Sequence, residues 1–370
     1  MTALPPLCYA APKVCGEVAF EQALQARARG YLAARNDHRH ADGAHLCKAA
    51  LLAAACLACY LLSLTAGTAS GFASAYLAAI AVCMLLNIDV NHDASHNVFL
   101  RSRRGNRVVG RLVTLLLGID PDYWRVRHVD FHHRYPNIEH YDLDTEENGI
   151  FRQTPFQRWR PHMRQQHRYW PLIAALSLTW IAWVFDWRDR LGRTPLRQHG
   201  LLPGSGGWAL FLASKLGHLL LALGLPLAAA SAHGLGWQLA LICYLAAQMA
   251  GSLLLVFLLL GTHWAQAAFY PAPPDGRLAQ GWHRHNFATA CDWLPTPRWL
   301  QWGMGGLNLH LTHHLFPGWH HRHYPALAGI VARTAAEHGL PYRCLGYREL
   351  LAGQRRFLRE MGRQPAEQGS

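Results

Sequence analysis

Charged residues are scarce in this sequence. Asp, Glu, Lys and Arg together make up 15% of the 370 residues, whereas hydrophobic residues make up 51%. A chain this apolar is not intrinsically disordered, and a soluble domain usually carries about 25% charged residues. The shortage of charge therefore favours a folded protein that keeps much of its surface away from water.

Cysteine pairs with metal-binding or redox spacing are missing from the polar segments. The nine cysteines include one CxxC pair, Cys56 and Cys59, which lies inside an apolar run and is better explained as small core residues. The pattern excludes a disulfide framework and argues against a built-in rubredoxin-like site or zinc ribbon. No cleavable signal peptide is predicted, because the first apolar run begins only at residue 49.

Long apolar runs are what the sequence does contain. Each of four stretches is close to the ~20 residues that cross a ~30 Å hydrocarbon core. They lie at about 49–66, 72–90, 210–232 and 237–260, and they pair into two helical hairpins with very short connections. A shorter stretch at 171–187 carries three tryptophans and is predicted to lie at the membrane interface, with a fifth span as the alternative.

The 35 basic residues give a net charge of +13, and their positions are uneven. Six lie in 1–48, seventeen in 91–207 and eleven in 263–370, whereas the two hairpin loops hold none. The positive-inside rule therefore predicts that both termini and the central segment are cytoplasmic, with a bacterial inner membrane as the natural location. The remaining basic residue, Lys215, lies in the third apolar run, and its side chain is expected to extend to the lipid head groups. The charge excess thus indicates topology and no nucleic-acid binding.

These patterns predict an all-α integral membrane protein. Its four transmembrane helices form two hairpins, and a helical cytosolic cap is built from 91–207 and 263–360. Residues 1–48 are predicted to be a cytosolic N-terminal segment, 49–360 the membrane domain, and 361–370 a disordered tail.

Histidine is abundant, with 24 residues, and three clusters stand out: HDASH at 92–96, HVDFHH at 128–133 and HLTHH at 310–314. Positions i and i+3 or i+4 share one face of a helix, so two imidazoles can bind one metal, and an adjacent histidine offers a second direction. Neutral imidazole suits first-row transition metals, and eight such ligands are too many for one tetrahedral ion. The clusters therefore predict a site for two metal ions, with the ligands His92, His96, His128, His132, His133, His310, His313 and His314.

The order and spacing of these boxes resemble those of the integral-membrane fatty acid desaturase family, which has HxxxH, HxxxHH and [HQ]xxHH boxes. The short sequence motifs around the boxes resemble those of bacterial acyl desaturases of the acyl-CoA or acyl-lipid type. They are WRVRH at 124–128, GGLN at 305–308, HLFP at 314–317 and HRHYP at 321–325. The likeness runs from about residue 70 to 345. It implies a helical membrane fold in which the cap holds the dimetal site.

In that family a further ligand usually precedes the third box. The matching stretch here is 285–293, so the resemblance implies His285 as a ninth ligand, with His263, His283, Asn286 and Asp292 as alternatives. Asp292 stands where the family has Asn, and His310 stands where related members often have Gln. Four aspartates near the boxes are expected to accept hydrogen bonds from imidazole N–H groups rather than to bind metal: Asp93, Asp130, Asp142 and Asp144.

The resemblance also implies the reaction. Two non-haem iron ions would use O₂ and two electrons from an external reductant to introduce a C=C bond into a fatty acyl chain, with no catalytic residue beyond the metal ligands. The sequence has no haem, flavin, dinucleotide or iron–sulfur motif, so the donor is predicted to be a separate ferredoxin or cytochrome b5-like protein. A basic face would attract an acidic donor, and also an acyl group on CoA or acyl carrier protein; a membrane lipid is the third carrier, and charge does not choose among them.

Three other functions stay open at this point. The same scaffold could hydroxylate the chain or form an alkyne. The histidines could instead hold zinc in a membrane hydrolase, whose activity would not need O₂. A non-enzymatic metal-handling protein is the third alternative, but it does not explain compact, ordered helical boxes.

Overall fold

The computed structural model describes residues 7–11 and 16–364, and their regular structure is mostly helical, as predicted. The chain divides into two compact units. Unit 1 contains His40–Val126 and Pro171–Val256, and unit 2 contains Arg127–Trp170 with the described parts of Leu4–Arg39 and Phe257–Ser370.

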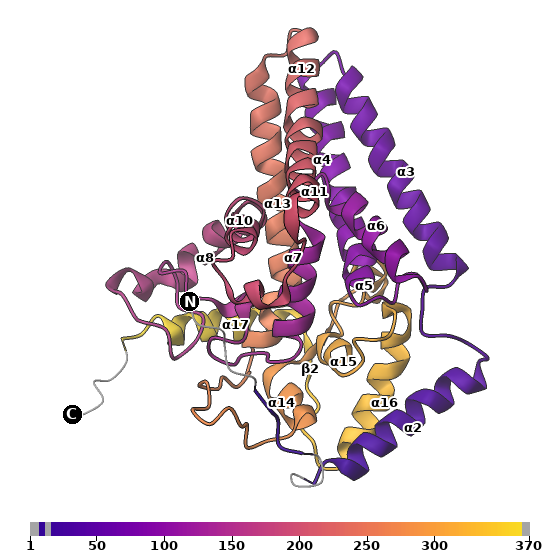
Figure 1. Ribbon diagram of the computed structural model, residues 1–370, viewed down its shortest axis with the longest axis vertical. Coiled ribbons are helices and arrows are strands. Elements are labelled where there is room, and N and C mark those ends of the chain that lie inside the picture. Colours follow the sequence, from indigo (N-terminus) through magenta and orange to yellow (C-terminus); the bar gives the residue numbers. More distant parts are fainter. Residues whose placement is uncertain (1–6, 12–15, 365–370) are drawn as a thin grey trace. The chain divides into compact units, whose positions relative to one another are not determined.

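Four long apolar helices form most of unit 1 (Figure 1). They are α3 (Gly43–Thr65); α4 (Ala69–Leu86), continued by η1 (Asn87–Asn91) and α5 (His92–Ser95); α11 (Gly204–His218), continued by η7 (Leu219–Gly224) and α12 (Leu225–Ala232); and α13 (Trp237–Trp264), whose last turns belong to unit 2. All four are long and apolar enough to cross a membrane. The four predicted apolar runs are confirmed as long helices, and each helix is longer than its predicted run at one end or both.

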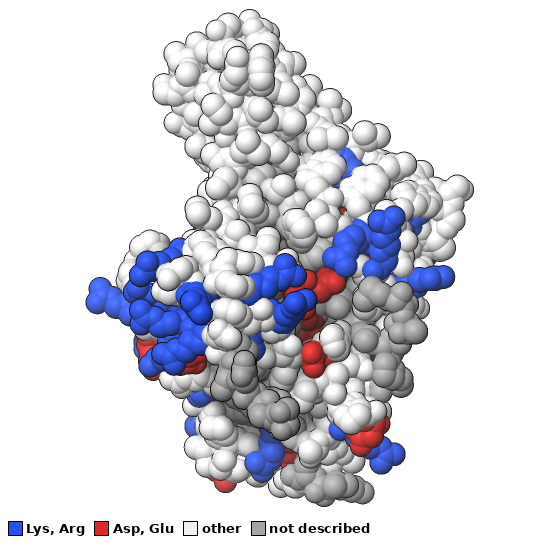
Figure 2. Space-filling view, turned by 90° about the vertical axis from the view of Figure 1, so that its left-hand side faces the viewer, with Lys and Arg blue, Asp and Glu red and all other residues white. Residues whose placement is uncertain are grey.

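The surface of these helices is apolar. On α3, Leu51 and Leu62 are 66% and 61% exposed, which is unfavourable in water and expected in lipid. The chain has no charged residue in 49–88 or in 216–274. On the face drawn in Figure 2, Lys and Arg side chains gather together, while a large part of the same face carries no charge. Unit 1 therefore presents the surface of an integral membrane protein.

Shorter helices complete unit 1. They are α6 (Arg103–Thr114), α7 (Pro121–Arg125), α9 (Ser177–Trp180), η5 (Ile181–Phe185), α10 (Asp186–Arg190) and η6 (Pro195–His199). The apolar stretch 171–187 is divided among α9, η5, α10 and the end of α8 (Gln166–Ala174), rather than forming one straight spanning helix.

Lys215 is buried within unit 1, so the expectation that it reaches the lipid head groups is wrong. Its side chain is 3% exposed, and its Nζ lies 2.6 Å from each of three acceptors: Gly118 O, Ala182 O and Asp186 Oδ2. The ammonium group thus uses all three of its donors inside the protein. It joins α11, η5, α10 and the turn before α7.

Replacing Lys215 by Met should destabilise unit 1 by about 3–5 kcal/mol, because the Asp186 carboxylate would stay buried without its cation. Thermal unfolding of the purified chain in detergent measures the loss. Adding Asp186→Asn to the same chain should recover part of it, since the amide is neutral. An unchanged melting temperature for Lys215→Met would contradict the described pairing.

Unit 2 is built from helices, several of which pack on a common apolar core. Its elements are α2 (Val18–Ala34), η2 (Val126–His132), η3 (Leu143–Thr145), η4 (Pro161–Gln165), α14 (Trp282–Thr289), η8 (Arg298–Gly303), α15 (His310–Leu315), η9 (His321–His323), α16 (Tyr324–Glu337) and α17 (Tyr347–Met361). The core joins α2, α14, α15 and α16 through residues such as Phe20, Leu24, Phe287, Leu311 and Leu327.

Two short strands and one helix fix the neighbourhood of the third histidine box. Strands β1 (Asp292–Leu294) and β2 (Cys344–Gly346) pair in parallel, with Asp292 opposite Cys344. After β2, α17 packs against the end of α13, where Gly261 leaves room for Leu350. The chain on either side of α15 is therefore anchored to a spanning helix.

The predicted domain limits stay predictions. Helix α17 ends at Met361, and residues 365–370 of the predicted tail lie outside the described part of the chain. In the predicted N-terminal segment, residues 1–6 and 12–15 also lie outside it. The described remainder includes α2, whose Arg27 pairs with Glu337 of α16 at 2.6 Å.

Candidate metal centre

A group of four buried histidines lies entirely within unit 2. His132 ends η2, His263 lies in the last turn of α13, and His310 and His314 are one turn apart on α15. One ring nitrogen from each lies within 4.8 Å of the others. The His310 Nε2 is 2.8 Å from the His263 Nε2 and 3.2 Å from the His314 Nε2. Two nitrogens bound to one metal at ~2.1 Å lie about 3.0–3.4 Å apart, so this spacing fits a shared ion.

The hydrogen bonds on the far side of these rings decide which nitrogen is available. The His263 Nδ1 lies 2.9 Å from Thr289 O, and the His314 Nδ1 lies 3.2 Å from the Asn286 Oδ1. Both oxygens accept, so both Nδ1 atoms carry the proton and both Nε2 atoms present a lone pair. These two lone pairs face the His310 Nε2, which can donate to only one of them. A cation satisfies them all, so the donor set fits a metal ion.

Two carboxylates support His132 in the same group. Its Nδ1 lies 3.1 Å from the Asp142 Oδ1 and 3.5 Å from the Asp144 Oδ2, and Asp142 also accepts from the backbone N–H of Asn137. Burial lowers the pKa of His132, but the two negative charges outweigh burial and raise it to about 9. The geometry therefore shows the expected hydrogen bond for Asp142, whereas Asp144 makes only an ion-pair contact with His132. Asp130 is half-buried on η2.

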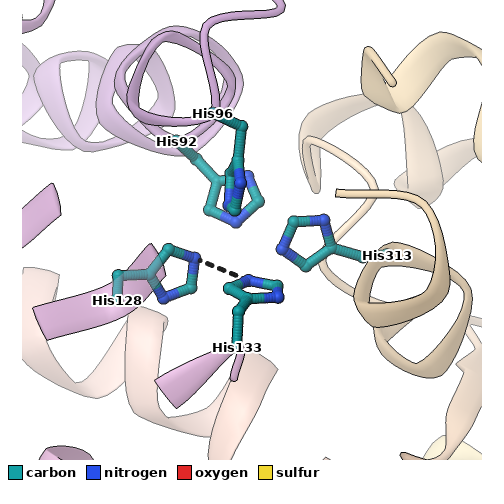
Figure 3. A group of neighbouring side chains, drawn as sticks. All are labelled: His92, His96, His128, His133 and His313. Atoms are coloured by element: carbon teal, nitrogen blue, oxygen red, sulfur yellow. Dashed lines mark hydrogen bonds between the residues drawn. The ribbon is translucent and has the colours of Figure 1, made fainter. Parts of the chain in front are cut away.

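A second group in unit 2 contains His128, His133 and His313. Figure 3 shows their rings turned toward one another, and the Nε2 atoms of His128 and His133 are 3.1 Å apart. The ring centroids of His133 and His313 are 4.4 Å apart. On its other side, the His313 Nδ1 shares a 2.7 Å hydrogen bond with the buried Tyr324 hydroxyl. This group, too, is a cluster of inward-facing imidazole nitrogens.

The second box serves both groups because its backbone is wound as a π-helix. His133 N–H donates to His128 O at 2.9 Å, an i to i+5 bond, so these two rings face each other. His132, one residue earlier, then points to the other group. The sequence predicted that an adjacent histidine pair could serve two metals, and the third box divides in the same way between His313 and His314.

The first box lies in unit 1. His92 begins α5 and His96 follows its last residue, and their ring centroids are 5.3 Å apart, so both rings project from one side of the helix (Figure 3). The His92 Nδ1 lies 3.6 Å from the Asp93 Oδ1, which is an ion-pair distance and too long for the expected hydrogen bond.

The structure does not bring His285 into either group. Its Nε2 lies 2.8 Å from Pro136 O, and its Nδ1 lies 2.8 Å from the Gln280 amide nitrogen. Burial lowers the pKa of His285 to about 4, so the ring is neutral and both nitrogens are hydrogen bonded. The histidine beside the third box is instead His263, whose only signal in the sequence is its position at the end of an apolar run.

The other alternative ligands support the site from outside. Asp292 accepts from Thr312 N and Oγ1, at 3.0 and 2.5 Å, and from the Tyr342 hydroxyl at 2.8 Å. Burial raises its pKa to about 6. This carboxylate therefore fixes the first turn of α15 between two box histidines. Asn286 accepts from His314, as described, and His283 lies against Glu17.

The fold is that of a helical membrane protein, and its histidine clusters are consistent with a site for two metal ions. Comparison with known proteins gives the same class a name: residues 68–346 match the family described as Fatty acid desaturase. The chain belongs to the fatty acid desaturase family and is an oxidoreductase of that family.

Individual relatives are similar over most of this chain. The sn-1 linoleoyl-lipid 6-desaturase of Synechocystis is 29% identical over 76% of this chain and 80% of its own length. The acyl-lipid (8-3)-desaturase of Physcomitrium patens is 29% identical over 70% of this chain, which spans about half (53%) of that relative. A second sn-1 linoleoyl-lipid 6-desaturase, from Arthrospira platensis, is 26% identical over 70% of this chain and 68% of its own length.

Proposed function

We propose that the chain is an O₂-dependent diiron desaturase that acts on acyl chains of membrane lipids. Within unit 2, one iron would be held by His132, His263, His310 and His314, and the other by His128, His133 and His313. His92 and His96 of the first box stay predicted ligands. The observation that carries the proposal is the pair of inward-facing histidine groups, whose lone pairs need cations. His285 is left out of the ligand set, because hydrogen bonds to Pro136 O and Gln280 occupy both of its nitrogens.

Iron is favoured over zinc by the reaction. Imidazole suits both metals, but zinc has no redox chemistry, and the family reaction is an oxidation. When bound, the iron pair would activate O₂, which is the oxidant. Overall, two hydrogen atoms leave neighbouring methylenes, the donor supplies two electrons and solvent supplies two protons, so that O₂ becomes two waters.

The residues of this chain orient the ligands and exclude water. Asp142, Thr289 O and Asn286 hold the Nδ1–H groups of three rings, so each presents its Nε2 in a fixed direction. All four histidines of that group are less than 10% exposed. A fixed, dry ligand set limits side reactions of the activated oxygen with solvent.

The lipid-linked substrate is inferred from the relatives. Several are named for acyl-lipid substrates, and none of those named above for acyl-CoA or acyl carrier protein. Expression of the full chain in a host that lacks polyunsaturated lipids, followed by short labelling with a radioactive fatty acid, tests this. The new double bond should appear first in intact lipid and require O₂. If the double bond appeared first in acyl-CoA or acyl carrier protein, that carrier would be the substrate instead of a lipid. A hydroxylated product would mean that the chain is a hydroxylase rather than a desaturase.

The electron donor is proposed to be a separate acidic protein, a ferredoxin or cytochrome b5-like protein, attracted by the basic side chains seen in Figure 2. Purified desaturase in nanodiscs should turn over with a ferredoxin and its reductase, and the rate should fall as salt rises from 50 to 500 mM, because the Debye length shortens. A rate independent of salt would contradict electrostatic docking.

We also propose that both termini and the metal centre face the cytoplasm. The support is that 34 of the 35 basic residues lie outside the four apolar runs and their loops. In a cysteine-free background, Ser231→Cys, next to the α12–α13 turn, should react with a membrane-impermeant maleimide in intact cells. Gln198→Cys should react only after lysis. The reverse pattern would invert the topology.

A further inference from the structure

Glu17 is an acidic residue that is almost completely buried, at 1% exposure, yet it lies just before α2 and far in sequence from the histidine boxes. Its carboxylate accepts from the first turn of α14: Oε2 lies 3.1 Å from the His283 N and Oε1 lies 3.2 Å from the Arg284 N. The same Oε2 is 3.3 Å from the His283 Nδ1. Glu17 therefore satisfies backbone donors that open a helix and otherwise have no partner within it.

The backbone at the start of α14 is shaped to admit this carboxylate. Gly281, the residue before the helix, lies so close to it that an added Cβ would be 2.5 Å from the Glu17 carboxyl atoms. Phe20, in the first turn of α2, contacts both His283 and Phe287 edge-on, with ring centroids 5.3 and 5.7 Å apart. The cap and the apolar contact together fasten α2 to α14.

Helix α14 in turn holds two histidines of the metal centre. The Asn286 amide nitrogen donates to Trp282 O in the first turn at 2.8 Å, which leaves its Oδ1 to accept from the His314 Nδ1 at 3.2 Å. At the end of the helix, Thr289 O accepts from the His263 Nδ1 at 2.9 Å. A continuous series of hydrogen bonds thus runs from Glu17 through α14 to both rings.

We infer that Glu17 is a positioning residue for the metal held by His132, His263, His310 and His314. By capping α14 it fixes the acceptors that set the tautomer and direction of His263 and His314. This inference rests on the proposed function, because it assumes that the group binds a metal. It gives the N-terminal segment of the chain a role in metal binding, although that segment contributes no ligand.

Cobalt binding to the full-length, metal-free protein in detergent tests the inference without turnover. Wild type should bind two Co²⁺ ions, seen as d–d absorption. Glu17→Ala should weaken the affinity for one of the two ions by about tenfold and leave the affinity for the other unchanged. A tenfold loss is the lower end of the range for removing the hydrogen-bond partner of a metal ligand. Glu17→Gln keeps one acceptor oxygen, so its affinity should lie between those of the wild type and Glu17→Ala. This variant also provides the test if Glu17→Ala does not fold.

A matched control separates capping from general loosening of α2. Arg27→Gln removes the ion pair with Glu337 and the hydrogen bond to Thr334 that hold α2 on α16, without touching α14, and should leave both affinities unchanged. In a double-mutant cycle, Glu17→Ala and Asn286→Ala should be less than additive, because they act on one series of bonds.

The outcomes are distinguishable. Wild-type affinities for both Co²⁺ ions in Glu17→Ala and Glu17→Gln would overturn the inference. So would a loss of affinity in Arg27→Gln as large as that in Glu17→Ala, or full additivity of Glu17→Ala with Asn286→Ala. Failure of the wild type itself to bind two Co²⁺ ions would instead overturn the two-metal site on which the inference rests.

Discussion

Replacing His313 or His132 by Ala should abolish the unsaturated product and remove iron at the same time. Each variant removes one ligand, from a different histidine group, so each should lose at least one iron per chain. Product should fall by more than about 100-fold, since loss of even a hydrogen-bond partner of a ligand typically costs 10- to 100-fold. Lipid-derived fatty acids and iron content, measured on the same preparations, give both values.

The control for these variants is an exposed histidine outside the boxes. His233→Ala lies beside the turn between α12 and α13 and should leave product and iron unchanged. Melting temperatures of all three variants report whether the chain still folds. Full activity in either His132→Ala or His313→Ala would contradict a metal centre built from the boxes.

Substituting His263 and His285 in turn should identify the ninth ligand, for which the resemblance implied His285 and the geometry favours His263. His263→Ala should behave like loss of a box histidine, because its Nε2 lies 2.8 Å from the His310 Nε2. His285→Gln should keep two irons, because Gln can still donate to Pro136 O and accept from Gln280. We therefore expect a product difference of about 100-fold or more between the two variants.

The same pair of variants can give the opposite answer. If His285→Gln lost iron and His263→Ala kept it, the resemblance to related desaturases would have named the ligand correctly, and the described geometry would be wrong at this position. Thermal melting separates either result from misfolding, since both side chains are buried.

The sequence predicts the spans and the eight box histidines because both depend on local spacing. Four runs of about twenty apolar residues need no tertiary information to be identified as helices that cross a membrane. The boxes are also local patterns: His310 and His314 share one helical face, and the structure keeps that relation.

What the sequence could not predict depends on contacts between distant segments. Lys215 is typical of a residue that reaches the head groups, and only the packing of α11 against the segments that carry Gly118 and Asp186 buries it. The resemblance implied His285 as the ninth ligand and His263 only as an alternative, and only the tertiary contacts reverse that order, because Thr289 O orients the His263 ring and Pro136 O accepts from His285. The π-helical turn at His128–His133 also has no pattern of its own, because an α-helix would fit the same letters.

The number and identity of the metal ions in the purified chain test the two-iron centre most directly. The full-length protein, expressed with iron and zinc both supplied and isolated in mild detergent, should contain two iron ions per chain by elemental mass spectrometry. Its iron should fall to one or none in His132→Ala and His313→Ala. A preparation that forms unsaturated product but holds zinc in place of iron, or a single metal ion, would contradict it.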